Sequence, residues 1–437
     1  MNPSSPARPT ALRGRAATRT AALLAATCLT AWPARAQEPE VLAIRAGKVV
    51  TMNARDEVLD GAVVLVRGGT IVAIGRDGEV ELPQGARVLD ARDLWLVPGL
   101  VDAHNHTAGS LSDLNDGVWL TNPGLRTLDT IAPGTDRLRD ALAGGVTSVL
   151  LIPGSGNNMS GFGTVTRTAG RTVEDMVLRA PGSIKIAQAG NPERYWFGVG
   201  RAYMNWNLAQ TLEKAKAYHE AWTAWEAVDA AAREGRGPPA GPAPARALEW
   251  EGFRGLFTHA FPASVHTQMY QVLHKTLLML DERFGLKVVL DHSTFDAFKL
   301  APLVKGRANV MTICGPRQFW FDRTERRIVG VAAKWMEGGL AELGINTDAP
   351  VVPQEELTLQ AALGSRLGLD PYQALRALTI VPAKALMIDR VVGSIEVGKE
   401  ADLGLWTGDP IDPRHACRVT LVRGRVVYDA DRERRRF

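Results

Sequence analysis

Eight short apolar runs, separated mostly by helical patterns, occupy residues 100–346 and limit the possible fold more than any other feature. Strands that alternate with helices build a parallel sheet covered by outer helices. Eight such units over about 290 residues suit a closed (β/α)8 barrel of the TIM type with insertions. We therefore expect an α/β fold whose strands are Leu100–His104, Val146–Ile152, Thr164–Arg167, Ile184–Gln188, Ala263–His266, Lys287–Asp291, Asn309–Ile313 and Glu342–Asn346.

The two ends of the chain have a different pattern from the middle. Residues 37–98 and 391–437 are dense in short β runs, and Arg67-Gly68-Gly69-Thr70 is a turn signal between two of them. We expect both ends to form one small, β-sandwich-like composite domain. The barrel would then occupy residues 99–390.

The largest insertion in the predicted barrel lies around residues 205–255. Leu212–Arg233 is rich in Ala, Glu and Lys and predicts a helix, whereas the Pro- and Gly-rich residues 235–245 cannot be helical. The tryptophans in and beside this segment either cover the barrel mouth or bury the insertion itself, and we favour the second. The other helices expected are Thr267–Arg283, Phe295–Val304, Thr324–Glu337 and Pro371–Leu378.

Residues 1–36 have the pattern of a secretory signal. Four arginines precede an apolar stretch, Ala21–Trp32, and Ala34-Arg35-Ala36 offers small residues where a signal peptidase cleaves. About twelve apolar residues are too few to span a bilayer. We expect export to the periplasm or secretion after cleavage near Ala36, with lipidation at Cys28 left open.

Charge and cysteine content exclude several functions. Residues 1–36 hold five Arg and no acid, so their removal changes the formal net charge from +4 to −1. The basic balance of the whole chain is therefore no argument for nucleic-acid binding. Cys314 and Cys417 alone are no disulfide framework, and Cys314 fits a core position. We expect no nucleic-acid partner and no stable membrane insertion of the mature chain.

Residues that bind metals stand near the ends of several predicted strands. His104 and His106 end the first run and project to one side, because strand side chains alternate between faces. His266, His292 and Asp348 end three later runs. Taken singly each is a weak signal, but catalytic groups of barrel enzymes lie at strand ends. The pattern predicts an open metal site that performs hydrolysis.

The predicted chemistry is activation of water by zinc. Zinc accepts imidazole and carboxylate ligands and lowers the pKa of a coordinated water to near 7. His104, His106 and either His266 or His292 would bind the metal. Asp348 could contact the metal, accept the proton of the attacking water and return it to the leaving amine.

The chain resembles the amidohydrolase superfamily, specifically its imidazolonepropionase-like branch with a composite β domain. Three motifs carry this resemblance: Pro98-Gly-Leu-Val-Asp-Ala-His-Asn-His106, Asn346-Thr-Asp-Ala-Pro350 and Gly393-Ser-Ile-Glu-Val-Gly-Lys-Glu-Ala-Asp-Leu403. It implies a metal-dependent hydrolase of carbon–nitrogen bonds. It also implies the ligands His104 and His106 on strand one, His266 on strand five, His292 on strand six, and the acid Asp348 on strand eight.

The number of metals depends on Lys185. Many members of the superfamily bridge two metals with a carboxylated lysine on strand four, and Lys185 is the candidate. A lysine that extends to solvent, or one paired with an acid, would explain the same sequence. In those cases a one-metal site remains chemically adequate. The expected cofactor is therefore one or two zinc ions, with another divalent metal left open.

We expect an exported enzyme that hydrolyses an amide, cyclic amide or dipeptide-like bond in a small molecule or short peptide. Asp348 and His292 are the expected catalytic residues, and His292 is also a ligand. The alternatives are a deaminase of aminated heterocycles on the same site and a silent barrel that only binds. The silent barrel predicts loss of a ligand, and none is evidently lost. The substrate and a homo-oligomeric state stay open.

Overall fold

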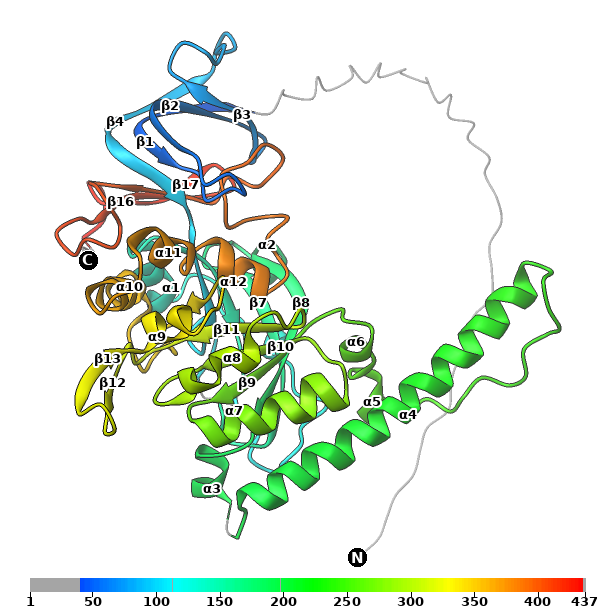
Figure 1. Ribbon diagram of the computed structural model, residues 1–437. Coiled ribbons are helices and arrows are strands. Elements are labelled where there is room, and N and C mark those ends of the chain that lie inside the picture. The colour runs from blue at the N-terminus through cyan, green and yellow to red at the C-terminus, as the bar shows by residue number, and fades with distance from the viewer. Residues whose placement is uncertain (1–39, 112, 197, 435–437) are drawn as a thin grey trace, which may run out of the picture. The chain divides into compact units, whose positions relative to one another are not determined.

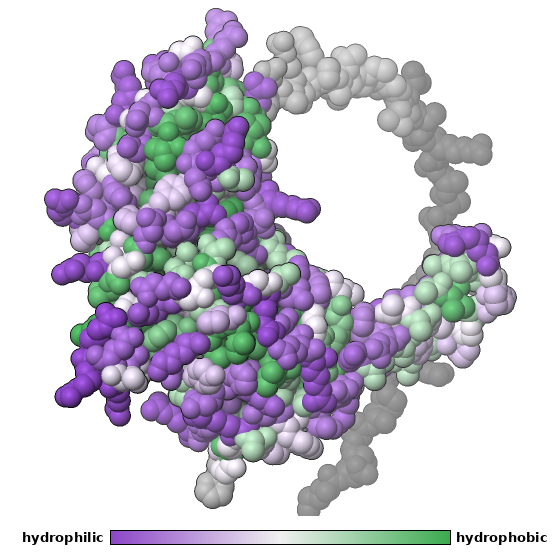
Figure 2. Space-filling model, in the orientation of Figure 1, coloured by the Kyte–Doolittle hydropathy of each residue, from purple (hydrophilic) through white to green (hydrophobic). Residues whose placement is uncertain are grey.

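A computed structural model describes residues 40–111, 113–196 and 198–434 of the chain. The described residues belong to one compact unit. The predicted signal at residues 1–36 lies outside the described residues. Within the described part no helix is both long and apolar enough to cross a membrane. The face seen in Figure 2 is mostly hydrophilic.

An eight-stranded, nearly closed sheet forms the centre of the molecule and is TIM-barrel-like (Figure 1). One parallel bridge, Asn105 to Ala349, joins its two edges. The predicted runs correspond to its strands in the predicted order. The strands are β5 (Leu100–Asn105), β6 (Val146–Leu151), β7 (Met159–Arg167), β8 (Val177–Ala187), β9 (Ala263–Thr267), β10 (Val288–His292), β11 (Val310–Cys314) and β14 (Gly344–Ile345).

The third strand departs from the predicted parallel sheet. β7 pairs antiparallel with both β6 and β8. Only residues 152–158 connect β6 to β7, and only residues 168–176 connect β7 to β8. Parallel neighbours need a crossover of about a dozen residues or more, so these connections permit only hairpins. The expectation of an all-parallel barrel was therefore wrong at this strand.

Helices follow most of the other strands. The predicted Thr267–Arg283 segment is α7 (Tyr270–Thr276) continued by the π-helix η2 (Leu277–Arg283). The other short helices are η1 (Thr127–Thr130), α1 (Asp136–Ala143), α2 (Val173–Met176), α3 (Asn191–Tyr195), α5 (Leu248–Glu251), α6 (Arg254–Phe257), η3 (Ala297–Leu300), α8 (Ala301–Val304), α9 (Val331–Glu337), η4 (Gln354–Glu356), α10 (Leu357–Arg366), α11 (Pro371–Arg376) and α12 (Ile380–Ala385).

The predicted helix Thr324–Glu337 was wrong in its first half. Strands β12 (Phe319–Asp322) and β13 (Arg327–Gly330) form an antiparallel hairpin, and helix α9 begins only at Val331. Asp322 accepts backbone hydrogen bonds from Thr324 and Glu325, which closes the turn between the strands. Such a side-chain-to-backbone turn competes with helix formation.

The insertion is dominated by helix α4 (Arg201–Arg233), which projects from the barrel in Figure 1. It begins earlier than the predicted Leu212 because its first half packs on the barrel core, where Leu208 is fully buried. Farther along, Trp222 contacts Trp225, whose indole N–H donates to the carbonyl of Gly241. Trp222 and Trp225 therefore pack within the insertion, as favoured from the sequence, whereas Trp250 packs against the barrel core.

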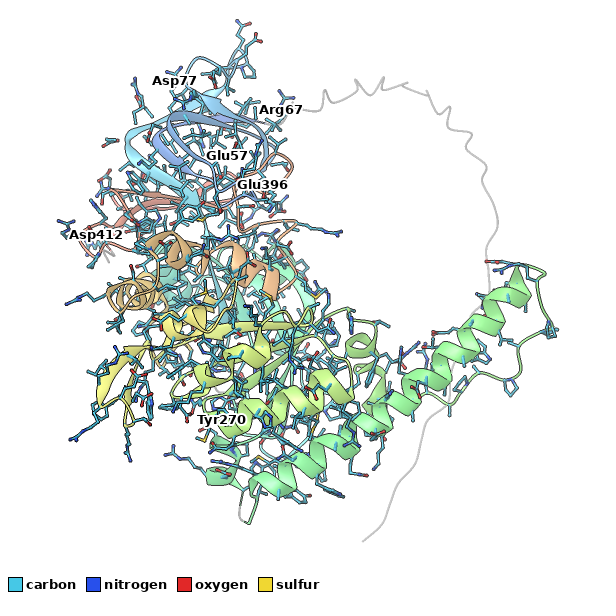
Figure 3. All side chains as sticks on the ribbon, in the orientation of Figure 1. Glu57, Arg67, Asp77, Tyr270, Glu396 and Asp412 are labelled. Carbon is cyan, nitrogen blue, oxygen red and sulfur yellow. The ribbon has the colours of Figure 1, made fainter. Side chains whose placement is uncertain are left out.

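Strands from both ends of the chain form a second, seven-stranded sheet, here called the terminal sheet. Its order along the sheet is β17 (Arg425–Asp429), β16 (Cys417–Val422), β15 (Leu403–Trp406), β4 (Arg87–Pro98), β1 (Val41–Val50), β2 (Val58–Arg67) and β3 (Thr70–Arg76). Buried aliphatic residues of β1, β2, β4 and β15 form its core. Glu57, Asp77, Glu396 and Asp412 (Figure 3) form ion pairs at its surface, where solvent screens the charges and the pairs contribute little to stability.

Gly99 joins the two sheets and sets the position of β5. Its N–H donates to the carbonyl of Asp402 at 2.8 Å. A Cβ on Gly99 would lie 2.2 Å from the hydroxyl of Thr147 on β6, so no larger residue fits. This close packing fixes where β5 starts and therefore where His104, near its end, lies.

Candidate metal centre

Three side chains from three strand ends come together at one end of the barrel sheet. One ligand atom each of His104, His292 and Asp348 lies within 4.8 Å of the others. Nε2 of His104 is 3.4 Å from Oδ1 of Asp348, and Nε2 of His106 is 3.2 Å from the same oxygen. The structure thus places the predicted histidine pair of β5 against the predicted acid after β14.

His292 presents a nitrogen that has no partner. Its Nδ1 lies 3.0 Å from the carbonyl oxygen of Gly315, so Nδ1 carries the proton and donates it. Nε2 is then a bare lone pair, and this buried atom has no hydrogen-bond partner in the described structure. A buried acceptor without a donor is costly. A cation at this position would satisfy it.

His106 and His266 are fixed in a similar way. Nδ1 of His106 is 2.7 Å from the carbonyl oxygen of Ile152, which leaves Nε2 facing Asp348. Nδ1 of His266 is 2.9 Å from the hydroxyl of Ser155, and its ring centroid is 4.6 Å from that of His292. His266 therefore lines the same site, although no ion pair joins it to Asp348 in the described structure. Ser155 lies in the connection between β6 and β7, residues 152–158, and this connection therefore helps to orient His266.

Lys185 on β8 reaches the same centre. It is fully buried, and its Nζ lies 2.8 Å from Nε2 of His104. Burial lowers the pKa of Lys185 to about 8, although the carboxylates of Asp291 and Asp348 act in the opposite direction. No carboxylate of the described residues lies within ion-pair distance of its Nζ. The alternative of a lysine paired with an acid therefore has no support in this geometry.

The protonation states are those that bind a cation. Burial lowers the pKa of His104 and His266 far below the usual range and that of His292 to about 4, so these rings are neutral near pH 7. Burial alone would raise the pKa of Asp348, but His292, His106 and Lys185 outweigh it and shift the pKa downward. The site therefore offers neutral imidazoles and an ionised carboxylate.

Two buried aspartates that the sequence analysis did not identify hold this arrangement. Oδ2 of Asp291 lies 3.0 Å from Nδ1 of His104. Asp102 accepts from the backbone N–H of His104 at 3.3 Å and from the hydroxyl of Thr347 at 2.5 Å, and so ties the end of β5 to the segment before Asp348. Burial raises the pKa of Asp291 well above its usual range and that of Asp102 to about 7.

Backbone strain is concentrated at the same strand ends. His292 has φ 69° and Asp348 has φ 52°, both in the left-handed region that non-glycine residues rarely adopt. Such conformations persist where the surroundings force them, and they cluster at functional sites. At His292 the left-handed backbone interrupts strand alternation. We infer that this is why the adjacent Asp291 and His292 can both face His104.

The other histidines of the described chain make contacts elsewhere. Nε2 of His259 lies 2.8 Å from the carbonyl oxygen of Gly285. His219 stacks on Phe257, His274 on Tyr270, and His415 contacts Thr407. None of these four histidines forms an ion pair with Asp348 in the described structure.

Comparison with known proteins identifies similar sequences and folds. The profile of the amidohydrolase family matches residues 339–430. Amidohydrolase tasK of Hapsidospora irregularis is 24% identical over 84% of this chain, which spans only 40% of that protein's length. An imidazolonepropionase of Sphingopyxis alaskensis is 25% identical over 84% of this chain and 91% of its own length.

Among solved structures, an amidohydrolase from Thermotoga maritima is 27% identical. It covers 89% of this chain and 100% of its own, with a TM-score of 0.76. The aligned region includes 89% of this chain, so it must contain residues of both the barrel sheet and the terminal sheet.

Proposed function

Because this chain belongs to the amidohydrolase superfamily, in its imidazolonepropionase-like branch, and is a hydrolase of carbon–nitrogen bonds, we propose that it uses a divalent metal held by the strand-end residues described above. His104, His106, His292 and Asp348 would hold the ion, with His266 beside them. We propose zinc, since imidazole nitrogens and carboxylate oxygens are donors that zinc accepts.

The donor set fits a cation on structural grounds alone. The unpartnered Nε2 of His292, and Nε2 of His106 held toward Asp348, are lone-pair donors in a buried site. The carboxylate of Asp348 supplies negative charge, and its oxygen already lies within 3.4 Å of two imidazole nitrogens. When bound, the metal supplies Lewis acidity toward the substrate carbonyl and lowers the pKa of water to near 7.

The residues of the chain then direct the proton and the substrate. The ionised Asp348 accepts a proton as water adds to the carbonyl carbon, and it returns that proton to the nitrogen as the C–N bond breaks. His292, held by Gly315, and His106, held by Ile152, keep fixed ring orientations during both steps. The carboxyl group of Asp291 lies 3.0 Å from His104 on the opposite side of the ring, where it can hold the ring in place.

The substrate class we propose is a small amide, a cyclic amide or a dipeptide-like molecule. The enzyme loaded with zinc should hydrolyse one member of a panel of N-acyl amino acids, dipeptides, lactams and hydantoins. Chelation should abolish the activity, and zinc should restore it. Hydrolysis at an equal rate in a metal-free sample would refute the proposal, and ammonia release from aminated heterocycles alone would indicate a deaminase instead.

We further propose that Lys185 is carboxylated and bridges two metals. Its buried Nζ, unpaired with any described carboxylate and next to His104, motivates this. Carboxylation joins the amine to CO2 with loss of one proton and yields an anion with two oxygens at that position. The readout is the carbamate signal in NMR after loading with isotope-labelled bicarbonate. Absence of that signal together with a single bound metal would contradict the proposal.

Export directed by residues 1–36 is also a proposal. It is supported by the four arginines, the apolar stretch Ala21–Trp32 and the small residues Ala34 and Ala36. The mature enzyme would then act on substrates outside the cell membrane.

A further inference from the structure

A cavity lies at the end of the barrel strands opposite to the metal centre. Its volume is about 1170 Å³. Arg167, the last residue of β7, lines it, whereas the other end of this strand, Met159, pairs with Ile186 next to Lys185. The turn between β16 and β17 and helix α1 form other walls. The cavity is thus built where the terminal sheet meets the base of the barrel.

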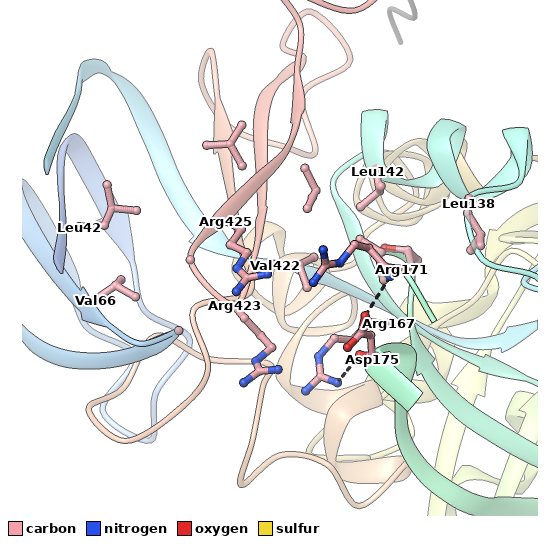
Figure 4. A pocket seen from close by; sticks show the side chains of 18 of the residues that line it. Leu42, Val66, Leu138, Leu142, Arg167, Arg171, Asp175, Val422, Arg423 and Arg425 are labelled. Carbon is pink, nitrogen blue, oxygen red and sulfur yellow. Dashed lines mark hydrogen bonds between the residues drawn. The ribbon is translucent and has the colours of Figure 1, made fainter. Parts of the chain in front are cut away.

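The lining of this cavity is strongly basic. Seven arginines and two carboxylates border it. Figure 4 shows the side chains of Arg171 and Arg425 pointing toward one another from opposite walls. No acidic residue of the described chain forms an ion pair with Arg171 or with Arg425. Within the described residues, the guanidinium groups of Arg171 and Arg425 therefore have no ion-pair partner.

Arg167 and Arg423 add two further guanidinium groups. Both approach the carboxylate of Glu400, Arg167 through a short hydrogen bond and Arg423 at 3.8 Å. Figure 4 shows these two side chains directed into the same space. Glu400 thus pairs with two arginines, and Arg167 has a second carboxylate, that of Asp402, at 4.0 Å. Arg171 and Arg425 form no ion pair within the described part of the chain.

Arg167 also carries an unsatisfied donor. Its side chain is only 8% exposed, and its Nε has no hydrogen-bond partner in the described structure. Oδ2 of Asp402 lies 4.0 Å from this Nε, beyond hydrogen-bond reach, and this oxygen too has no hydrogen-bond partner in the described structure. A buried charged donor without an acceptor is costly and indicates a missing ligand or water.

We propose that this cavity binds a small phosphorylated molecule. Planar guanidiniums bind phosphate oxygens with paired hydrogen bonds, and several of them around one space favour a doubly charged group over a monocarboxylate. Leu138 and Leu142 of α1 and Val422 of β16 also line the cavity and offer an apolar wall to the organic part. The site is independent of hydrolysis at the metal centre.

Binding would connect the two sheets. Arg167 and Arg171 belong to the barrel side, whereas Arg423 and Arg425 stand at the β16–β17 turn of the terminal sheet. A single anion contacting both pairs would stabilise the folded state in proportion to the logarithm of its concentration over Kd.

The test uses the full zinc-loaded enzyme and two probes, inorganic phosphate and glycerol phosphate. Calorimetry and thermal unfolding at constant ionic strength measure Kd and the shift in Tm. The double variant Arg171→Gln/Arg425→Gln should weaken binding by about tenfold or more. The control Arg246→Gln/Arg366→Gln removes two exposed arginines outside the cavity and should leave Kd unchanged.

Three results would overturn the proposal. The first is no binding of either probe at millimolar concentration. The second is equal weakening in both double variants, or in neither, which would place the phosphate on the metal or on general surface charge. The third is sedimentation with phosphatidylglycerol vesicles but no binding of soluble phosphate, which would assign the cavity to a lipid headgroup.

Discussion

Oδ2 of Asp291 lies 3.0 Å from Nδ1 of His104, and both side chains are fully buried. Neither atom has a hydrogen-bond partner in the described structure, so the two form a close polar contact on one side of the ring, while Nε2 on the other side faces Asp348. A carboxylate behind a metal-binding histidine sets its tautomer and raises its basicity, and removing it typically costs 10–100-fold in metal affinity.

We therefore expect Asp291→Asn to weaken zinc binding by roughly 10–100-fold. Competition with a chelator of known affinity, followed by metal analysis, measures this change. Asp93→Asn, at an exposed position of β4, is the matched control and should bind zinc like the unmodified chain. Equal zinc affinity of the two variants would show that Asp291 does not support the site.

Asp348→Asn should lower kcat by about 10²–10⁴-fold, because an amide cannot accept the proton of the attacking water. The assay uses the substrate identified by the zinc-restoration experiment. Metal content must be measured alongside, since Asp348 also contacts two ligand histidines. Asp389→Asn, which lies outside the site, is the control. Near-normal turnover by the Asp348 variant at full zinc loading would exclude it as the proton carrier.

Much of the barrel could be predicted from the sequence because buried strands leave continuous apolar runs. All eight runs correspond to strands of the sheet, in order. The orientation of β7 was missed because apolar content does not reveal strand direction. The short connections at residues 152–158 and 168–176 were the signal that could have shown it. The β12–β13 hairpin was missed because its turn depends on Asp322, a single capping side chain.

The candidate site was only partly visible in the sequence. The pairing of His104 and His106 followed from strand alternation, and the structure brings both to Asp348. Asp291 was missed because alternation would direct it away from His292. The left-handed backbone at His292 interrupts the alternation of side chains, and a histidine in the sequence does not predict such a conformation. Asp102 was missed because its partner Thr347 is distant in the sequence.

Lys185→Met should reduce the bound zinc from about two ions per chain to about one, if the lysine bridges two metals. Methionine has a similar shape and needs no polar partner, so the buried position should tolerate it. Metal analysis after gel filtration gives the stoichiometry. Lys287→Met, at the residue just before β10, is the control and should keep the unmodified stoichiometry. The same metal content in the unmodified chain and in Lys185→Met would contradict a bridging lysine.

Replacing Ala34 and Ala36 by Arg should prevent removal of residues 1–36 after expression in a bacterial host, because the peptidase requires small side chains there. Cell fractionation and mass analysis of the N-terminus measure the result. The unmodified chain should be found outside the inner membrane and begin near Gln37. If both forms keep their first residues and stay inside spheroplasts, the export proposal is wrong.

Glu342→Gln should remove part of the stability that the protein has above about pH 4.5. Nζ of Lys384 donates to both carboxylate oxygens of Glu342, at 2.7 and 2.9 Å, and Arg376 donates at 2.6 Å. Burial alone would raise the pKa of Glu342, but these hydrogen bonds outweigh it and lower the pKa. A carboxyl whose pKa is lower in the folded state stabilises the fold when ionised. This contribution is present above the unfolded pKa and is lost as the pH falls through the folded pKa.

The measurement is urea unfolding of both forms at several pH values between 3 and 7. We expect the variant to be about 1–3 kcal/mol less stable near pH 7 and the difference to shrink toward pH 3. Glu337→Gln is the control, because its pair with Lys334 is largely exposed and contributes little. A stability difference that does not change with pH would mean that Glu342 acts through packing and not through its charge.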